Sequence, residues 1–323
     1  MDKLTDKFGR TVSYARISVT DRCNFRCKYC MPQDGVVPFS HNDILSYEEI
    51  IKLSFVLRDL GIEKIRFTGG EPLLRKDFLL FLDKFKSLFP SINLSFTTNA
   101  SLLTKYETTF SKLNLDSINI SLDTLDSDKF KDITLLGDLS NVLDGVKLAV
   151  SSKVKKVKLN TVLIRGFNDN EVYDLITYAN KQGTIIRFIE LMPLNRALWS
   201  KNDSITFKEM LDTLPNKCRK ISIRRERFAG PAEYYTDETT GYIFGVITAM
   251  SNHFCKDCNR IRFSSTGQLR RCLFDPAEIS VREYLHLEDE RILKKIIIDS
   301  IRSKSLCWND VELGHNDMYS IGG

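Results

Sequence analysis

Three cysteines near the start of the chain, Cys23, Cys27 and Cys30, follow a C-x3-C-x2-C pattern. Three thiolates on one short loop can hold three irons of a [4Fe–4S] cluster, which normally takes four cysteines. The fourth iron is then open to a ligand from outside the protein, as the metal of a catalytic site keeps an open position. The spacing therefore predicts an iron–sulfur cluster that binds an exogenous ligand.

The segment before this triplet, residues 14–20 (YARISVT), is apolar and β-branched and predicts a strand. The cysteines then follow the C-terminal end of a strand, where α/β folds place their active sites. A zinc knuckle or a disulfide staple would be alternative uses of the triplet. Zinc sites prefer four ligands with C-x2-C pairs, and no secretory context favours disulfides, so the cluster is the favoured interpretation.

A second group, Cys255, Cys258 and Cys272, has the spacing C-x2-C-x13-C. Residues 263–274 (FSSTGQLRRCLF) are typical of a hairpin that returns Cys272 toward the first two cysteines. Three cysteines alone also fit zinc with His253 as the fourth ligand. At this point the pattern leaves a second [4Fe–4S] cluster and a zinc site both open.

Arg260 and Arg262 lie two residues apart, so on an extended chain both side chains face one side. Surface arginines usually face solvent, but two guanidiniums beside an iron with an open position suit a polyphosphate ligand. Cys218 and Cys307 are isolated from both cysteine groups in the sequence. For each of them we predict a buried thiol without a metal role.

The composition, 42% hydrophobic and 28% charged over 323 residues, predicts a soluble globular protein of about two domains. The first ten residues show no signal or transit peptide, and the apolar runs are too short to span a membrane. We therefore expect a cytoplasmic protein, in which eight cysteines favour metal binding or catalysis over disulfides. The net charge of +5 is spread along the chain and predicts no nucleic-acid partner.

Strand-like and helix-like segments alternate through the first two thirds of the chain. Apolar or β-branched runs predict strands at residues 14–20, 64–68, 93–98, 117–122, 157–164 and 185–192. Amphipathic stretches predict helices at residues 46–60, 77–88, 139–151 and 169–181. Six β-α units imply a parallel sheet with right-handed crossovers. Because a closed barrel needs eight, we predict an α/β fold with a partial (βα)6 TIM-type barrel.

The pattern changes after Pro193. A helix is predicted at residues 206–214, hairpins at 227–247, and a long amphipathic helix at 288–304 after the second cysteine group. We therefore expect two domains, a barrel at residues 1–193 and a C-terminal iron–sulfur domain at residues 194–323.

Several sequence motifs are distributed along the whole chain. They are TDRCNFRC around the first triplet, IRFTGGEPLLR (65–75), SLDTLD (121–126), RFIELMP (187–193), the second triplet with NRIR, and the terminal Gly322–Gly323. GGEP-like segments alone occur across radical S-adenosylmethionine (SAM) enzymes. Taken together, the motifs resemble those of the GTP 3′,8-cyclases, a family of radical SAM lyases that begin molybdenum cofactor biosynthesis, and the resemblance covers essentially the whole chain.

The resemblance implies two [4Fe–4S] clusters, one on each triplet and each without a fourth protein ligand, with SAM chelated by the open iron of the first. It implies SAM contacts from Tyr29, Gly70, Ser121 and Met192. It implies GTP contacts from Arg16, Arg66, Thr97, Lys158, Arg260, Ile261 and Arg262. Without it, a core methionine would be as good an interpretation of Met192, and a solvated face a better one of Arg66 and Lys158. The tail Gly322–Gly323 is implied to enter the site, where the alternative is a frayed terminus.

The implied reaction is the cyclisation of GTP to (8S)-3′,8-cyclo-7,8-dihydroguanosine 5′-triphosphate. A 5′-deoxyadenosyl radical from SAM takes hydrogen from the ribose C3′, and C3′ then bonds to C8 of the guanine. The implied partners are GTP, a reducing electron donor, and cyclic pyranopterin monophosphate synthase, which takes the product. A homodimer is among the assemblies we allow for, and no membrane partner is expected.

Two other classes of protein stay open. One is another radical SAM enzyme with an auxiliary cluster, such as a peptide-modifying maturase, although those usually carry more C-terminal cysteines. The other is a non-catalytic iron–sulfur or zinc binding module, which would have no use for GGEP or for polar strand ends.

Two positions depart from the family pattern. Ala100 stands where glycine is more common, so the turn after the third strand is expected to differ slightly. Glu233 stands where relatives often have a basic residue.

Overall fold

The structure is a computed structural model, and it describes residues 3–194, 201–222, 230–276 and 279–311. The predicted site residues Gly322 and Gly323 lie outside the described residues. The chain divides into two compact units. The first comprises residues 1–24, 30–97 and 255–323, and the second comprises residues 25–29 and 98–254. Each unit is an α/β assembly.

The first unit has a mainly parallel sheet with the strand order β12-β11-β10-β1-β2-β3. Strand β1 pairs in parallel with both β2 and β10, and β2 pairs in parallel with β3. The strands are β1 (Tyr14–Ser18), β2 (Lys64–Thr68), β3 (Asn93–Thr98), β10 (Arg260–Phe263), β11 (Gln268–Arg270) and β12 (Ile279–Ser280). The helices are α1 (Tyr47–Asp59), α2 (Phe78–Leu88), α8 (Arg282–Leu285) and α9 (Glu290–Arg302), with short 3-10 turns at Pro72–Leu74, Cys255–Asp257 and Trp308–Asp310.

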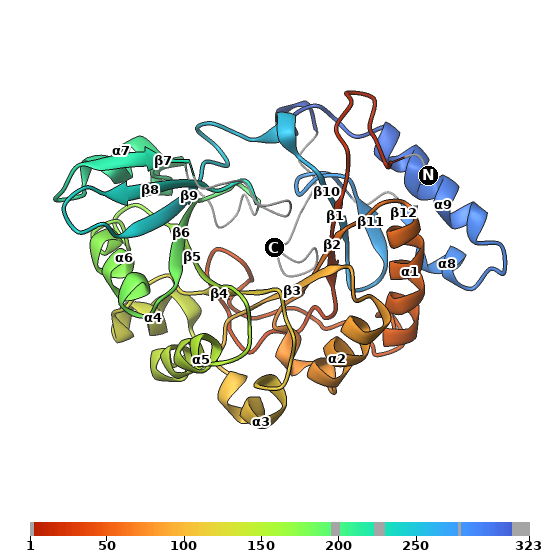
Figure 1. Ribbon diagram of the computed structural model, residues 1–323, viewed down its shortest axis with the longest axis horizontal. Coiled ribbons are helices and arrows are strands. Elements are labelled where there is room, and N and C mark those ends of the chain that lie inside the picture. The colour runs from red at the N-terminus through yellow and green to blue at the C-terminus, as the bar shows by residue number, and fades with distance from the viewer. Residues whose placement is uncertain (1–2, 195–200, 223–229, 277–278, 312–323) are drawn as a thin grey trace. The chain divides into compact units, whose positions relative to one another are not determined.

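Helices α1 and α2 cover one face of this sheet (Figure 1). Helix α1 begins with the predicted capping box, in which Ser46 Oγ accepts from the Glu49 N–H at 3.0 Å and the Glu49 carboxylate accepts from the Ser46 N–H at 2.6 Å. Phe67 of β2 packs edge-on against Phe81 and Phe85 of α2, with ring centroids 5.1 Å apart in both pairs. The apolar faces of these helices therefore pack against one face of the sheet and hold its strands in place.

The second unit has the strand order β4-β5-β6-β9-β8-β7. Strands β4, β5, β6 and β9 run parallel, and β8 and β7 add an antiparallel edge. The strands are β4 (Ser117–Ser121), β5 (Val157–Leu163), β6 (Ile185–Glu190), β7 (Cys218–Ile221), β8 (Glu233–Asp237) and β9 (Ile243–Ile247). The helices are α3 (Glu107–Phe110), α4 (Ser127–Thr134), α5 (Leu139–Ser151), α6 (Val172–Lys181) and α7 (Phe207–Asp212), with 3-10 turns at Leu103–Tyr106 and Lys201–Asp203.

All six predicted strands, β1 to β6, are present in parallel pairs with helices between them, so the predicted α/β class with a partial barrel is confirmed. Strands β9 and β10 are further parallel strands, which the sequence reading had placed among hairpins and cysteine-rich segments. The domain boundary after Pro193 stays a prediction. No helix in the described part of the chain is both long and apolar enough to cross a membrane.

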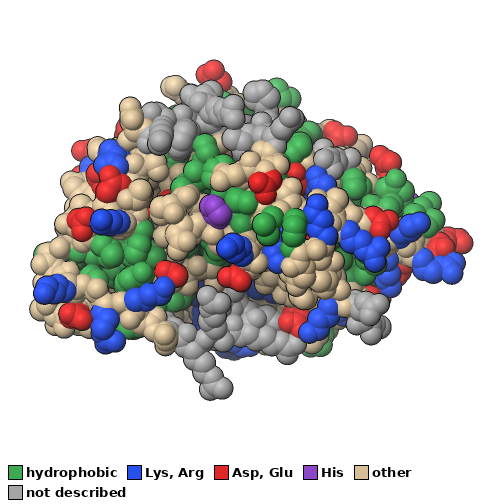
Figure 2. All heavy atoms as spheres, turned by 90° about the horizontal axis from the view of Figure 1, so that it is seen from above, with side chains coloured by type: hydrophobic (Ala, Val, Ile, Leu, Met, Phe, Trp, Pro, Cys, Tyr) green, Lys and Arg blue, Asp and Glu red, His purple; other side chains and the backbone are tan. Residues whose placement is uncertain are grey.

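The two departures from the family pattern have simple structural settings. Ala100 has φ of +62°, the left-handed conformation that glycine adopts most readily, so alanine occupies a position whose backbone favours glycine. Glu233 on β8 forms an ion pair with Lys220 on β7 at 2.7 Å. On the face shown in Figure 2, acidic and basic side chains are interspersed.

Candidate active site

A cluster of basic side chains lies on one face of the first unit's sheet. The strand register aligns Arg262, Arg16 and Arg66 in one row across β10, β1 and β2. The neighbouring row, two residues earlier on each strand, contains Arg260, Tyr14 and Lys64. Because alternate residues of a strand share a face, all six side chains lie on the same face. We call these six residues the basic face.

Four residues of the basic face are buried, Arg16 and Arg260 are half-buried, and the cations repel one another. Arg66 and Arg262 are 5% and 4% exposed. Burial, and after it the positive charge of the nearby Arg260, lower the pKa of Arg262 to about 10. Burial alone would raise the pKa of Tyr14, but Arg66, Arg16, Lys64 and Arg260 outweigh it and lower that pKa to about 7. Clustered cations that repel one another bind a polyanion favourably, because its charge relieves the repulsion.

The other predicted GTP contacts have different settings. Thr97 lies in β3 of the first unit, and its hydroxyl has no hydrogen-bond partner among the described residues. Ile261 stands between the two arginines in the sequence of β10, so its side chain points to the opposite face of the sheet, where it is fully buried. It can therefore reach a ligand on the basic face only through its backbone. Lys158 lies in the second unit on β5, opposite Asn119 of β4.

The first cysteine triplet is on the loop that follows β1. Its three thiols are half-buried, and none of the eight cysteines forms a disulfide, so the disulfide alternative is not realised. Cys23 and Cys30 belong to the first unit and Cys27 to the second. The middle of the loop is anchored within the second unit, because Phe25 packs edge-on against Phe130 with ring centroids 5.8 Å apart. Three accessible thiols are the donor set that an iron–sulfur cluster needs.

The GGEP turn after β2 packs directly on the cysteine loop. The N–H of Gly70 donates to the Thr20 carbonyl at 2.9 Å, and the N–H of Glu71 donates to the Arg22 carbonyl at 2.7 Å. A Cβ on Gly70 would lie 2.2 Å from that Arg22 oxygen. Only glycine at position 70 therefore allows the GGEP turn to pack this closely against the cysteine loop. This packing fixes the backbone of Arg22, the residue immediately before Cys23.

Tyr29, a predicted SAM contact, is held by a residue that the sequence reading missed. Its hydroxyl donates to Asp123 Oδ2 at 2.7 Å, and Asp123 Oδ1 accepts from the N–H of Val162 at 2.8 Å. Asp123 is 5% exposed, and this burial raises its pKa to about 6, against the opposing effect of the two hydrogen bonds. The sequence signal that could have identified Asp123 is its place in the SLDTLD motif, two residues after the end of β4. The other predicted SAM contacts in this unit are Ser121, which ends β4, and Met192, which follows β6.

We expect Asp123→Asn to weaken SAM binding by up to about tenfold, since one hydrogen bond contributes about 0.5–1.5 kcal/mol. The variant also changes the pH dependence of stability. Because folding raises the pKa of Asp123 from 3.8 to about 6, the folded state binds this proton more tightly than the unfolded chain. The wild-type free energy of unfolding should therefore fall, relative to the variant, as pH rises from about 4 to about 6.

Calorimetric SAM titration and urea unfolding at several pH values test this expectation. Asp132→Asn is the matched control, since Asp132 pairs with Lys28 of the same loop at 2.6 Å but is 59% exposed, and an exposed pair contributes little. Identical pH profiles for wild type and Asp123→Asn would contradict the role of Asp123.

The second cysteine group has a buried cation beside it. Lys304, just beyond α9, is 2% exposed, and its ammonium donates to the carbonyls of Arg260, at 2.9 Å, and Arg271. These residues flank Cys258 and Cys272. Burial raises the pKa of Cys258, but Lys304 and Arg260 outweigh it and lower that pKa. A thiol in a cationic setting ligates readily as thiolate, so Cys258 fits an anionic cluster, whereas burial raises the pKa of both Cys255 and Cys272. The sequence predicted only that a helix ends near Lys304.

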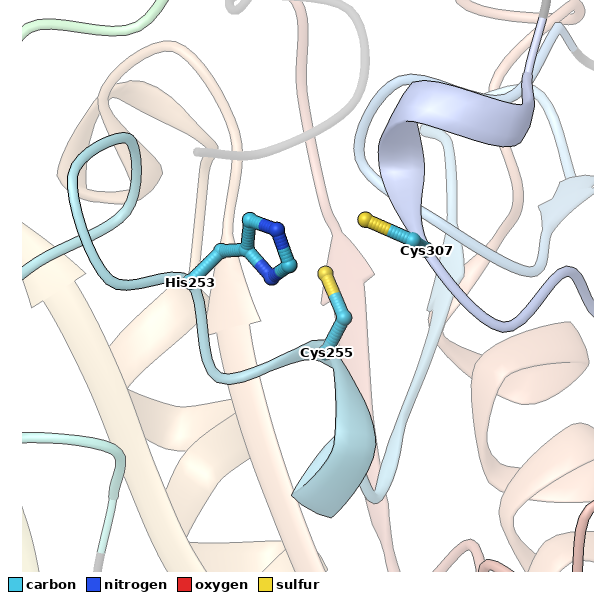
Figure 3. Close-up of side chains that lie close together, drawn as sticks. All are labelled: His253, Cys255 and Cys307. Carbon is cyan, nitrogen blue, oxygen red and sulfur yellow. The ribbon is translucent and has the colours of Figure 1, made fainter.

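Cys307 is far from the second cysteine group in the sequence, but it is half-buried and lies close to Cys255 in space. The ligand atoms of His253, Cys255 and Cys307 all lie within 4.8 Å of one another, and Figure 3 shows their side chains pointing toward a common point. The zinc alternative grouped His253 with the second triplet, whereas the structure groups it with Cys255 and Cys307. Cys218 is a half-buried thiol on β7, and burial raises its pKa.

Comparison with known proteins agrees with this arrangement. A family model described as the radical SAM superfamily matches residues 17–179, and one described as Molybdenum Cofactor Synthesis C matches residues 184–309. The crystal structure of Streptococcus suis SuiB superposes with a TM-score of 0.62, covering 90% of this chain and 68% of that chain at 13% identity. Identity this low shows the fold alone. The fold, with its cysteine triplet after β1, is that of the radical SAM superfamily, which implies SAM and one [4Fe–4S] cluster as cofactors.

The particular family is given by closer relatives. The chain is 40% identical over 324 residues to the GTP 3′,8-cyclase of Peptoclostridium acidaminophilum, covering 99% of this chain and 98% of that protein. It is 37% identical over 322 residues to the GTP 3′,8-cyclase of Thermodesulfovibrio yellowstonii, covering 99% and 100%. This chain belongs to the GTP 3′,8-cyclase family.

Proposed function

We propose that this protein cyclises GTP to (8S)-3′,8-cyclo-7,8-dihydroguanosine 5′-triphosphate, an early step of molybdenum cofactor biosynthesis. The observation that carries the proposal is the basic face beside the second cysteine group. Arg262 links the basic face to the second cysteine group, because the thiols of Cys272 and Cys258 lie near enough to affect the pKa of its guanidinium. Buried guanidiniums suit a triphosphate, and neither a peptide substrate nor a plain metal module would need them.

The first triplet and its surroundings would hold the radical-generating cofactors. Cys23, Cys27 and Cys30 would ligate one [4Fe–4S] cluster, and SAM would contact Tyr29, Gly70, Ser121 and Met192. When bound, these cofactors supply the 5′-deoxyadenosyl radical that takes hydrogen from C3′ of GTP. The protein's task is orientation, because reacting atoms must be held at near-attack distance. The Tyr29–Asp123 hydrogen bond and the tight Gly70 turn serve that purpose.

The substrate would lie against the basic face. Arg16, Arg66, Arg260 and Arg262 would bind the triphosphate, together with Lys64, which occupies the same face. Thr97, Lys158 and the backbone of Ile261 would complete the contacts. Cys255, Cys258 and Cys272 would hold a second [4Fe–4S] cluster whose open iron faces the purine, with Lys304 offsetting its negative charge.

The remaining expectations belong to the same proposal. Residues 1–193 would form the barrel domain and residues 194–323 the second-cluster domain, with Gly322–Gly323 entering the site, as the family resemblance suggests. The protein would work in the cytoplasm, take electrons from a reducing donor and pass its product to cyclic pyranopterin monophosphate synthase. A homodimer is the assembly we propose to look for first.

Arg262→Ala should weaken GTP binding by about ten- to a hundredfold, since a hydrogen bond to a charged group contributes about 1.5–3 kcal/mol. Guanosine affinity should barely change, because guanosine has no phosphate. Calorimetric titration under anaerobic conditions measures both. Arg219→Ala is the control, since Arg219 on β7 is 67% exposed. Equal affinity of the wild type for GTP and guanosine would refute a triphosphate clamp.

Anaerobic turnover with reconstituted protein, SAM, dithionite and GTP tests the function itself. The product is an isomer of GTP, because the hydrogen atom lost from C3′ is replaced by an electron and a proton, so chromatography must precede mass spectrometry. We expect 5′-deoxyadenosine and the isomer to form together, in a GTP-dependent way. SAM cleavage that ignores GTP would contradict the proposal, as would zinc in the second triplet after anaerobic purification.

A further inference from the structure

We propose that Cys307 is a reserve ligand of the second iron–sulfur centre, able to replace Cys255 on the same iron. The inference rests on the proposed second cluster and adds a residue to it. In this exchange the Cys307 sulfur would bond to iron and give up its proton, while the Cys255–iron bond would break and the departing thiolate would take that proton. One iron–sulfur bond replaces another, and no electron is transferred.

The distance between the two sulfurs supports the exchange. The Sγ atoms of Cys255 and Cys307 lie within 4.8 Å and point toward one another (Figure 3). Two thiolates bound to one tetrahedral metal at about 2.3 Å are roughly 3.8 Å apart. A small side-chain movement would therefore bring Cys307 to the iron that Cys255 holds. Cys258 and Cys272 are not in this close group, as suits thiolates that bind other irons.

A buried arginine holds the two cysteine segments together. Arg10 is 8% exposed, and its guanidinium donates to the carbonyl of Cys255 at 2.7 Å, of Ser305 at 2.6 Å and of Leu306 at 2.8 Å. Its Nε is paired with the buried Asp6 at 2.5 Å. One side chain thus fixes the backbone at Cys255 and at the two residues before Cys307, so their proximity is built into the first unit.

The residues around Cys307 make two further contacts with the second centre. The N–H of Trp308 donates to the thiol of Cys255. The indole of Trp308 stacks on Phe274, with ring centroids 4.8 Å apart, and Phe274 follows Cys272 by two residues. Lys304, three residues before Cys307, binds the carbonyls beside Cys258 and Cys272. The segment from Lys304 to Trp308 therefore contacts Cys255 and residues within two positions of Cys258 and Cys272.

The test counts iron and sulfide in full-length protein reconstituted anaerobically, with electron paramagnetic resonance of the reduced clusters as a second readout. Wild type should hold about eight irons, four for each cluster. Cys255→Ala and Cys307→Ala should each keep about eight, whereas Cys272→Ala should fall to about four. The double variant Cys255→Ala/Cys307→Ala should also fall to about four.

His253 lies at the same point, so Cys255→Ala/His253→Ala is the matched control and should keep both clusters if the thiol is the replacement. Loss of the second cluster from Cys255→Ala alone, with native circular dichroism, would overturn the inference. The inference would also be overturned if Cys255→Ala/His253→Ala lost the second cluster while Cys255→Ala/Cys307→Ala kept it. A wild type with only the first cluster would instead refute the second cluster of the proposed function, and is recognised before any variant is made.

Discussion

Cys23→Ala should leave no detectable cleavage of SAM. The substitution leaves two thiolates on the loop where the cluster needs three, and the first cluster should be lost while the second remains. Iron content should then fall from about eight to about four per chain. Formation of 5′-deoxyadenosine and iron content, measured on the same reconstituted samples, test both parts of this expectation.

The fold should survive this change. Cys23 is half-buried and forms no disulfide, so alanine removes a ligand without opening a core cavity. Cys218→Ala is the matched control, because Cys218 is another half-buried thiol outside both triplets and should keep both clusters and full activity. SAM cleavage by Cys23→Ala at a wild-type rate would show that the triplet does not hold the reactive cluster.

Gly70→Ala should cause a comparable loss by a steric route. The new Cβ would lie 2.2 Å from the carbonyl oxygen and 2.5 Å from the carbonyl carbon of Arg22, and 2.9 Å from the carbonyl oxygen of Asp21. These are backbone atoms of the loop that carries Cys23, so relief requires the loop to move. Overpacking typically costs about 1–3 kcal/mol, and a clash with backbone belongs at the upper end of that range.

Urea unfolding and iron content after reconstitution measure the effect of Gly70→Ala. Gly230→Ala is the control, since no atom of the described residues lies within 4 Å of the Cβ position there and its backbone does not require glycine. We expect Gly70→Ala to be less stable and to hold the first cluster incompletely, and Gly230→Ala to match the wild type. Unchanged stability and iron content in Gly70→Ala would contradict the tight turn.

Much of the fold was readable from local sequence, because apolar and β-branched runs bounded by polar turns specify strands directly. The spacing of Arg260 and Arg262 also predicted that they share a face. Their alignment with Arg16 and Arg66 was not readable, since it depends on β10 pairing in parallel with β1, a contact between opposite ends of the chain. Strand partners far apart in sequence are set by tertiary packing, not by local pattern.

The residues that the sequence reading missed act through the same kind of remote contact. Lys304 follows an amphipathic helix, where a lysine usually faces solvent and interacts with the helix end. Only the tertiary structure brings it to the carbonyls that flank Cys258 and Cys272. The proximity of Cys307 to Cys255 was not readable for the same reason, because the two residues are far apart in the sequence and meet only in the folded chain.

Turnover of GTP deuterated at the ribose C3′ shows whether GTP is the molecule that loses hydrogen to the radical. In anaerobic turnover with SAM and dithionite, the hydrogen taken by the SAM-derived radical would come from that carbon. We expect 5′-deoxyadenosine to gain one deuterium and the isomer of GTP to lose it. Unlabelled 5′-deoxyadenosine, formed alongside intact deuterated GTP, would contradict the assignment of GTP as the substrate.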